Sequence, residues 1–368
     1  MTTGFFSDEK CFWHGGGAYA LTLPLGGLVQ PLAAGGLPEN PETKRRLKNL
    51  MEVTGLINEL SCQSAPLADR AALARVHPES YLDAFKKMSD ADGGEIGYHA
   101  PFLPGGYEIA ALSAGLAVAA VNAVATGALK NAYALSRPPG HHCLPDNPNG
   151  FCLFNNIAVA IEAARAAGTA RRFVVLDWDV HHGNGTEAIY YDDADVLTIS
   201  IHQENNYPVD SGALEDRGSG AAVGTNINIP LPPGAGHAAY LYTMDRIVTP
   251  AITAFDPDMI IVACGFDAAI FDPLASMLAT TETFRALTKQ IMQTAHEVCD
   301  DKLVLVHEGG YSEAYVPFCG HATIATLAGS QTDAPDPLGP VVAKRQPNSE
   351  MDRIHRGIID RMATQLEL

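Results

Sequence analysis

The sequence lacks paired cysteines: its seven cysteines are scattered singly along 368 residues, and no CxxC pair occurs. An odd, dispersed set argues against a disulfide framework and is typical of a reducing compartment. The N-terminus, MTTGFFSDEK, lacks the basic region and the following apolar run of a signal peptide. We therefore expect a cytoplasmic protein.

Positive charge is scarce. The 24 lysines and arginines stand against 42 aspartates and glutamates, which gives a formal net charge of −18. This balance disfavours a broad nucleic-acid-binding surface, because such surfaces carry an excess of lysine and arginine. The acidic surface could attract a cationic substrate, or it could simply maintain solubility.

The uncharged stretch of residues 109–129 is long enough to cross a bilayer. It consists mostly of alanine, and serine, glycine, asparagine and threonine interrupt it. We interpret it as a buried helix and expect no association with a membrane.

Apolar strands alternate with helices along most of the chain, and no repeat or convincing linker interrupts them. This pattern predicts one α/β domain, residues 1–368, with a parallel sheet covered by helices on both faces. Residues 1–40 are rich in glycine and proline and are expected to be long loops, and residues 330–368 a C-terminal surface appendage. The expected helices span residues 43–60, 107–127, 155–168, 237–255, 281–299 and 313–328, and the strands lie in NAYALS, RFVVLDWDV, VLTISIH, MIIVACGFDA and KLVLVHEGGY.

Acidic side chains follow two of these strands, where ligands bind in such sheets. In FVVLDWDVHHGNG, the alternation of a strand would place Asp177, Asp179 and His181 on one side. Burying them is costly unless a cation holds them, so they indicate either a divalent metal or a carboxylate–histidine pair. Asp267 ends the strand IIVACGFDA and is either a cap or a third metal ligand. Three ligands would leave an open position, as in catalytic zinc sites, and ferrous iron is a chemically reasonable substitute.

A tandem histidine and a tyrosine follow two other strands. His141 and His142, in SRPPGHHC, are either a surface pair or an acid and a base, and Asp177 and Asn184 are available to fix their tautomers. Tyr311 follows a Gly-Gly turn that is either structural or presents an oxyanion donor. The sequence has no GxSxG elbow, P-loop or GxGxxG after a strand, so nucleophilic serine and nucleotide chemistry are disfavoured.

The motifs RPPGHH, GFCLFNN, LDWDVHHGNGT, GFDA and EGGY, in this order, resemble the histone deacetylase superfamily over residues 40–325. Asn184 resembles the class II branch and the bacterial histone deacetylase-like amidohydrolases, since class I enzymes usually carry aspartate there. The resemblance implies an arginase/deacetylase α/β fold with long loops at the active-site end. It also implies a zinc-dependent deacylase of bacterial origin whose zinc ligands match Asp179, His181 and Asp267.

The same resemblance implies separate catalytic roles for the zinc ion and three side chains. Zinc and His142 would activate water, zinc and Tyr311 would stabilise the oxyanion, and His141 would assist proton transfer to the leaving amine. The partners of the two histidines would be Asp177 and Asn184. Backbone carbonyls of Asp177, Asp179 and His181, together with Ser200 and Ile201, would hold a structural potassium ion.

The resemblance is less specific for the residues that would line the substrate tunnel. Gly150 and Phe151 match one wall, and Tyr207 stands where the family usually has phenylalanine, which leaves the acyl preference open. Leu274 corresponds to a position where a polyamine-selective relative carries glutamate, so we expect an acyl-lysine-like substrate. Arg46 matches a buried arginine near an internal product channel, or is an ordinary surface arginine.

Three other functions compete with this one. A deacylase of acetylated polyamines or other small amides would use the same chemistry. A two-metal enzyme of the arginase kind would need further carboxylates where Val180 and His182 stand. A catalytically silent metal-binding scaffold would have lost part of the site, which is complete here. The oligomeric state stays open, and the N-terminal loops offer surface for a homo-oligomer.

Overall fold

The computed structural model describes residues 2–15, 19–20, 22–24 and 36–368 of the chain. An eight-stranded sheet runs through it, and all neighbouring strands are parallel, which confirms the predicted fold class. The strand order is β10 (Asn226–Leu231), β9 (Val196–Gln203), β8 (Phe173–Asp177), β11 (Met259–Cys264), β12 (Leu303–His307), β7 (Asn131–Ala134), β1 (Thr3–Phe6) and β4 (Ser61–Gln63).

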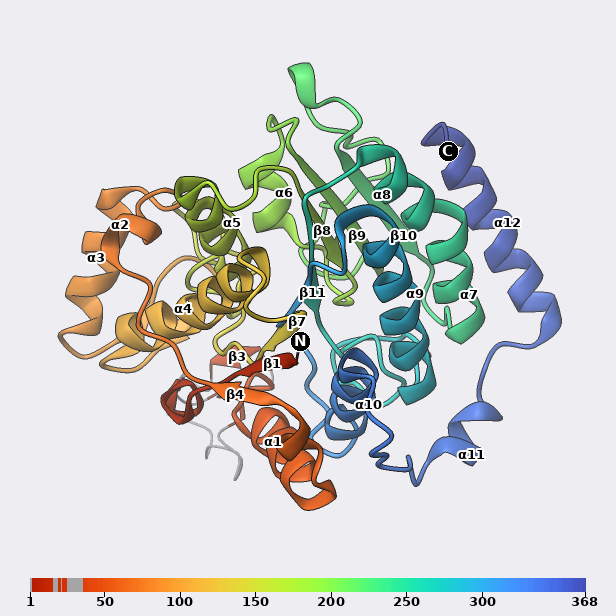
Figure 1. Cartoon of the computed structure of the whole chain (residues 1–368), viewed down its shortest axis with the longest axis horizontal. Helices are drawn as coiled ribbons and strands as arrows, with labels where there is room; N and C mark the ends of the chain where they lie inside the picture. The colour runs from red at the N-terminus through yellow and green to blue at the C-terminus, as the bar shows by residue number, and fades with distance from the viewer. Residues whose placement is uncertain (1, 16–18, 21, 25–35) are drawn as a thin grey trace.

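The central strands are buried on both faces, which is why they are nearly continuous apolar runs. In β8, Val174 and Leu176 pack into one hydrophobic cluster, whereas Phe173 and Val175 pack into another on the opposite face. The sheet therefore has a helical layer on each side (Figure 1).

One layer consists of α4 (Gly106–Ala125) and α5 (Asn156–Ala167), which pack against each other. The other contains α1 (Glu42–Thr54), α7 (His237–Thr243), α8 (Thr249–Phe255), α9 (Thr281–Cys299) and α10 (Val316–Ala328). The predicted helix 237–255 is divided by a π-turn, Met244–Val248. The turn lies just before Pro250, which has no N–H to donate to the preceding helix.

The remaining elements complete the described chain. They are α2 (Arg70–Leu73), α3 (Glu79–Ser89), α6 (Asn184–Tyr190), α11 (Gly339–Ala343), α12 (Ser349–Gln365), the strand pairs β2 (Tyr19–Ala20) with β3 (Leu23–Pro24) and β5 (Gly94–Glu95) with β6 (Pro101–Phe102), the 3-10 turns η1 (Glu9–Trp13), η2 (Leu56–Glu59) and η3 (Gly220–Ala222), and the π-turn above, η4.

In the described part of the chain, α4 is the helix with the length and hydropathy to cross a membrane. It packs against α5, and 61% of its most apolar window is buried within the protein. The helix thus has the position that its alanine content predicted, in the interior beside the sheet.

Two details at the ends of the chain differ from what the sequence led us to expect. Residues 3–6 are not loop: they form β1, which lies inside the sheet between β7 and β4. Residues 330–368 are not only a surface appendage, because α12 buries Ile359, Met362 and Ala363 in the main core. Of the predicted N-terminal loops, residues 16–18, 21 and 25–35 lie outside the described residues.

Candidate metal centre and active site

The site lies at the carboxyl edge of the sheet, where parallel strands bring their following loops together. Asp179 and His181 follow β8, Asp267 follows β11, and Tyr311 follows β12. The tandem histidines follow β7. Strand β8 ends at Asp177, so the alternation predicted across residues 177–181 stops there, and a turn places Asp179 and His181 instead.

Asp179, His181 and Asp267 converge on one point. The Nδ1 atom of His181 lies 3.1 Å from Oδ1 of Asp179 and 3.1 Å from Oδ2 of Asp267. One ligand atom from each residue lies within 4.8 Å of the others, and all three side chains are buried. Backbone N–H groups hold the carboxylates: Gly309 donates to Asp179 at 2.7 Å and Val180 donates to Asp267 at 2.8 Å.

The electrostatics of this cluster fit a divalent cation. Burial alone would lower the pKa of His181, but Asp179 and Asp267 raise it to about 10. Burial and the neighbouring Asp179 raise the pKa of Asp267 to about 6. Two buried carboxylates thus require a positive charge between them, and a zinc ion bound by the three donors would supply it in place of the histidine proton.

Two glycines leave room for the carboxylates. A Cβ atom on Gly309 would lie 2.0 Å from Oδ2 of Asp267, and one on Gly265 would lie 2.2 Å from Oδ2 of Asp179. Any other residue at either position would collide with a carboxylate oxygen of this cluster. Glycine stands directly after β11, at Gly265, and two residues after β12, at Gly309, because the carboxylate cluster occupies the space of a side chain, a constraint that sequence reasoning missed.

The tandem histidines differ in their partners. The Nδ1 atom of His141 lies 2.9 Å from Oδ2 of Asp177, and that of His142 lies 2.8 Å from Oδ1 of Asn184. Burial opposes protonation of both rings, but Asp179 and Asp177 raise the pKa of His141 to about 10. For His142, burial together with the neighbouring histidines lowers the pKa well below its usual value. The ring of His141 thus holds a proton more firmly than the ring of His142.

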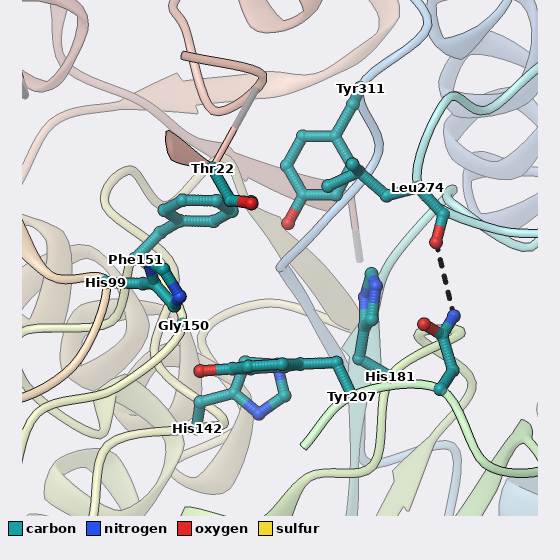
Figure 2. A pocket seen from close by; sticks show the side chains of 10 residues that line it. Thr22, His99, His142, Gly150, Phe151, His181, Tyr207, Leu274 and Tyr311 are labelled. Carbon is teal, nitrogen blue, oxygen red and sulfur yellow. Dashed lines mark hydrogen bonds between the residues drawn. The ribbon is translucent and has the colours of Figure 1, made fainter. Parts of the chain in front are cut away.

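A cavity of about 140 Å³ leads to this point, and its walls are mostly apolar. Figure 2 shows the rings of Phe151 and Tyr311 across the cavity from His142 and Tyr207. The hydroxyl of Tyr207 donates to Asn149 Oδ1, which joins the two loops that form the walls. The residues that line the cavity are Thr22, His99, His142, Gly150, Phe151, His181, Asn206, Tyr207, Leu274 and Tyr311.

Arg46 does not lie in an internal channel: its side chain is 56% exposed and lies 3.7 Å from Glu42. The buried cations are instead Lys44 and Arg137, which flank Glu39. The spacing of Lys44 with Leu47 and Met51 on one face of α1 is the signal that could have identified Lys44.

Sequence reasoning also missed two buried acids, Asp272 and Glu308. Asp272 accepts the backbone N–H of Tyr311 at 2.8 Å, and burial with the charge of Asp267 raises its pKa to about 8. Burial raises the pKa of Glu308 to about 7. Of the predicted potassium-site residues, Ser200 lies opposite Asp177 in the β8–β9 register, and its hydroxyl lies 2.9 Å from Nδ1 of His202.

Comparison with known proteins gives this geometry a family context. The histone deacetylase domain family matches residues 37–327. The chain is 54% identical over 366 residues to a histone deacetylase-like amidohydrolase of Pseudomonas aeruginosa, covering 100% of this chain and 96% of that protein. It is 35% identical over 332 residues to a probable deacetylase of Archaeoglobus fulgidus, covering 88% of this chain and 92% of that protein.

A solved structure agrees with these matches. The crystal structure of the HDA15 HD domain aligns with a TM-score of 0.81 and 29% identity, covering 99% of each chain. The family match spans β7, β8, β11 and β12 and the loops after them, which carry the metal cluster, the tandem histidines and Tyr311. The chain belongs to the histone deacetylase family, and its relatives support an amide-deacylating enzyme.

Proposed function

We propose that this protein is a zinc-dependent amidohydrolase that removes acetyl-type acyl groups from amines, with acyl-lysine-like substrates. One observation carries the proposal. A buried Asp179–His181–Asp267 cluster lies beside two histidines, of which His141 has a raised pKa and His142 a lowered pKa. Amide hydrolysis needs these parts together: an electrophile for the carbonyl, a base for water and an acid for the amine.

The metal would be held by Asp179, His181 and Asp267. When bound, zinc supplies a Lewis acid that polarises the acyl carbonyl and makes a water molecule more acidic. Ferrous iron would suit the same oxygen and nitrogen donors. A structural potassium ion stays part of the proposal, on backbone carbonyls at the end of β8 and on Ser200 and Ile201.

The protein's own groups would move the protons. His142 donates its Nδ1–H to Asn184, so its Nε2 is left as an acceptor and takes a proton from the attacking water. His141, protonated beside Asp177, gives a proton to the departing amine. Burial and nearby acids keep the pKa of Tyr311 well above 10, so its hydroxyl stays a hydrogen-bond donor for the developing oxyanion.

The cavity supports the choice of substrate class. Its walls at Phe151 and Leu274 are apolar and suit the methylene chain of an acylated lysine. No carboxylate is among the described residues that line it, so the second ammonium group of an acetylated polyamine would find no counter-charge there. We therefore place acyl-lysine ahead of polyamines.

The test is a hydrolysis assay on zinc-loaded protein with acetyl-lysine peptide, trifluoroacetyl-lysine peptide and acetylspermidine, each with and without a hydroxamate chelator. We expect turnover of the lysine peptides that the hydroxamate abolishes. Preferential turnover of acetylspermidine would reject the acyl-lysine assignment but keep the chemistry. Full zinc occupancy without turnover of any of the three would reject the proposal and favour a scaffold.

A further inference from the structure

Glu308 is buried directly after β12 and contacts a loop that is distant in sequence. Its Oε2 atom accepts the backbone N–H of Gly140 at 2.6 Å and that of His141 at 3.0 Å. Its side chain is fully buried, and Oε1 has no hydrogen-bond partner among the described residues. A single carboxylate oxygen thus ties the end of β12 to the backbone of a tandem histidine.

Directly before the tandem histidines, the loop after β7 has few backbone N–H groups. Pro138 and Pro139 have no backbone N–H, so the amides of Gly140 and His141 are the first two donors after Arg137. The loop is also tightly packed, because a Cβ on Gly140 would lie 2.5 Å from the backbone nitrogen of Asn156. Glu308 therefore supplies the acceptor for both amides at the point where the loop presents the His141 ring.

The residues after Glu308 fix two other parts of the site. Gly309 donates its N–H to the proposed metal ligand Asp179 at 2.7 Å, and Tyr311 donates its N–H to Asp272 at 2.8 Å. The contact with the His141 backbone and the contact with Asp179 thus lie on adjacent residues, Glu308 and Gly309. A displacement of Glu308 would therefore change the spacing between His141 and the proposed metal ligands.

We propose that Glu308 is a positioning residue: its carboxylate sets the position of the His141 backbone so that the ring meets Asp177 and the reacting amide together. The proposal rests on the proposed function. It explains why the Glu308 carboxylate is buried with one oxygen unpartnered. This arrangement lowers the stability of the fold, and a catalytic need for the geometry would maintain it. A misplacement of a catalytic group by about 1 Å can cost about 100-fold in rate.

Three substitutions distinguish the effect of the length of the Glu308 side chain from the effect of its charge. Glu308→Gln keeps an oxygen at the same distance from the backbone, Glu308→Asp keeps the charge but is one methylene shorter, and Glu308→Ala removes the acceptor. Each variant is examined as zinc-loaded full-length protein by hydrogen–deuterium exchange of the amides of Gly140 and His141, by zinc stoichiometry, and by kcat and KM on an acetyl-lysine peptide.

We expect Glu308→Gln to retain wild-type exchange at both amides and kcat within about threefold. In Glu308→Asp and Glu308→Ala, both amides should exchange faster and kcat should fall by about 10- to 100-fold, with KM and zinc content unchanged. Asp336→Ala is the matched control: it also removes an oxygen that accepts two hydrogen bonds, from Thr281 and Tyr315, and it should leave these exchange rates at the wild-type value.

Wild-type exchange in Glu308→Ala would overturn the proposal. A loss of kcat in Glu308→Gln as large as in Glu308→Asp would also overturn it, because the position of the acceptor oxygen would then not explain the effect. If Glu308→Ala does not fold, the comparison of kcat and amide exchange between Glu308→Gln and Glu308→Asp still tests the proposal. The exchange rates test the positioning even where the acyl-lysine assignment fails, because that failure shows as absent turnover in the wild-type protein.

Discussion

The Nδ1 atom of His141 lies 2.9 Å from Oδ2 of Asp177, and both side chains are buried. The adjacent His142 directs its Nδ1 to a neutral amide, that of Asn184. Two histidines next to each other in sequence differ in pKa, because Asp179 and Asp177 raise the pKa of His141, whereas burial and the neighbouring histidines lower that of His142. The first prediction follows from this difference.

Replacement of Asp177 by asparagine should lower kcat by about 100-fold, the scale of a general acid's contribution. The Asp177 carboxylate raises the pKa of His141, so its loss lowers that pKa and depletes the protonated ring as pH rises. The alkaline limb of the kcat profile should therefore move to lower pH. An unchanged limb in a well-folded Asp177→Asn protein would contradict the assigned role.

Tyr311→Phe should retain zinc and substrate affinity but lower kcat by about 100-fold or more, the cost of one oxyanion donor. The substitution removes the hydroxyl alone, since the backbone N–H of residue 311 bonds to Asp272 in either case. The measurement is kcat and KM on acetyl-lysine peptide. Tyr315→Phe is the control, because that hydroxyl bonds to Asp336 away from the cavity; comparable losses in both variants would reject the role.

Asp267→Ala should abolish activity and weaken zinc binding by more than about 100-fold, because loss of a mere hydrogen-bond partner of a ligand costs about 10- to 100-fold. Zinc stoichiometry after dialysis, measured by mass spectrometry, reports the change. Asp272→Asn is the matched control: burial and Asp267 raise the pKa of Asp272 to about 8, so at neutral pH it is mostly a neutral acid that asparagine imitates. Full zinc occupancy in Asp267→Ala would remove Asp267 from the ligand set.

The arrangement of the site was predictable where strands end in unexpected polar residues. Asp179, Asp267 and Tyr311 each follow an apolar strand, and parallel strands bring such ends to the same edge. The two short strands at one end of the strand order were not predictable in the same way. Strand β1 is only TGFF and β4 only Ser61–Gln63, too short to show a period, and their pairing depends on the sheet already formed.

The buried Glu39–Lys44–Arg137 group escaped prediction for another reason. Helix α1 contains Lys44, Arg45 and Arg46 in succession, and the rotation of the helix against the sheet decides which of them enters the core. Lys44 does, together with Leu47 and Met51, while Arg46 faces solvent. A pattern of charges alone does not fix that rotation; the apolar residues three and seven positions later do.

Tyr207→Phe should loosen the tunnel. The hydroxyl of Tyr207 joins its loop to Asn149 on the other wall, and the ring lies edge-on to His142 at 5.0 Å between centroids. Loss of a hydrogen bond worth about 1 kcal/mol should raise the ratio of kcat/KM for butyryl-lysine over acetyl-lysine peptide by about fivefold. The exposed Tyr98→Phe should leave this ratio unchanged, and an unchanged ratio in Tyr207→Phe would show that the wall does not set the acyl preference.

The acid stability of the fold should depend on Glu39. Its carboxylate lies 3.0 Å from Arg137 and 3.2 Å from Lys44, and all three side chains are about 1% exposed. Burial would raise the pKa of Glu39, but these two cations lower it from 4.5 to about 2. The stabilisation from ionised Glu39, about 3 kcal/mol, is therefore complete above pH 4.5 and is lost as the pH falls toward 2.

Urea unfolding between pH 5 and pH 2.5 measures this loss. Glu39→Gln should be less stable than the wild type at pH 5, because it leaves two buried cations without a counter-charge. Its stability should also fall less steeply on acidification, since it has no carboxylate to protonate. Glu52→Gln, on the exposed face of α1, should keep the wild-type slope. Equal slopes in wild type and Glu39→Gln would mean that Glu39 is not ionised in the folded protein, and that another acid balances Lys44 and Arg137.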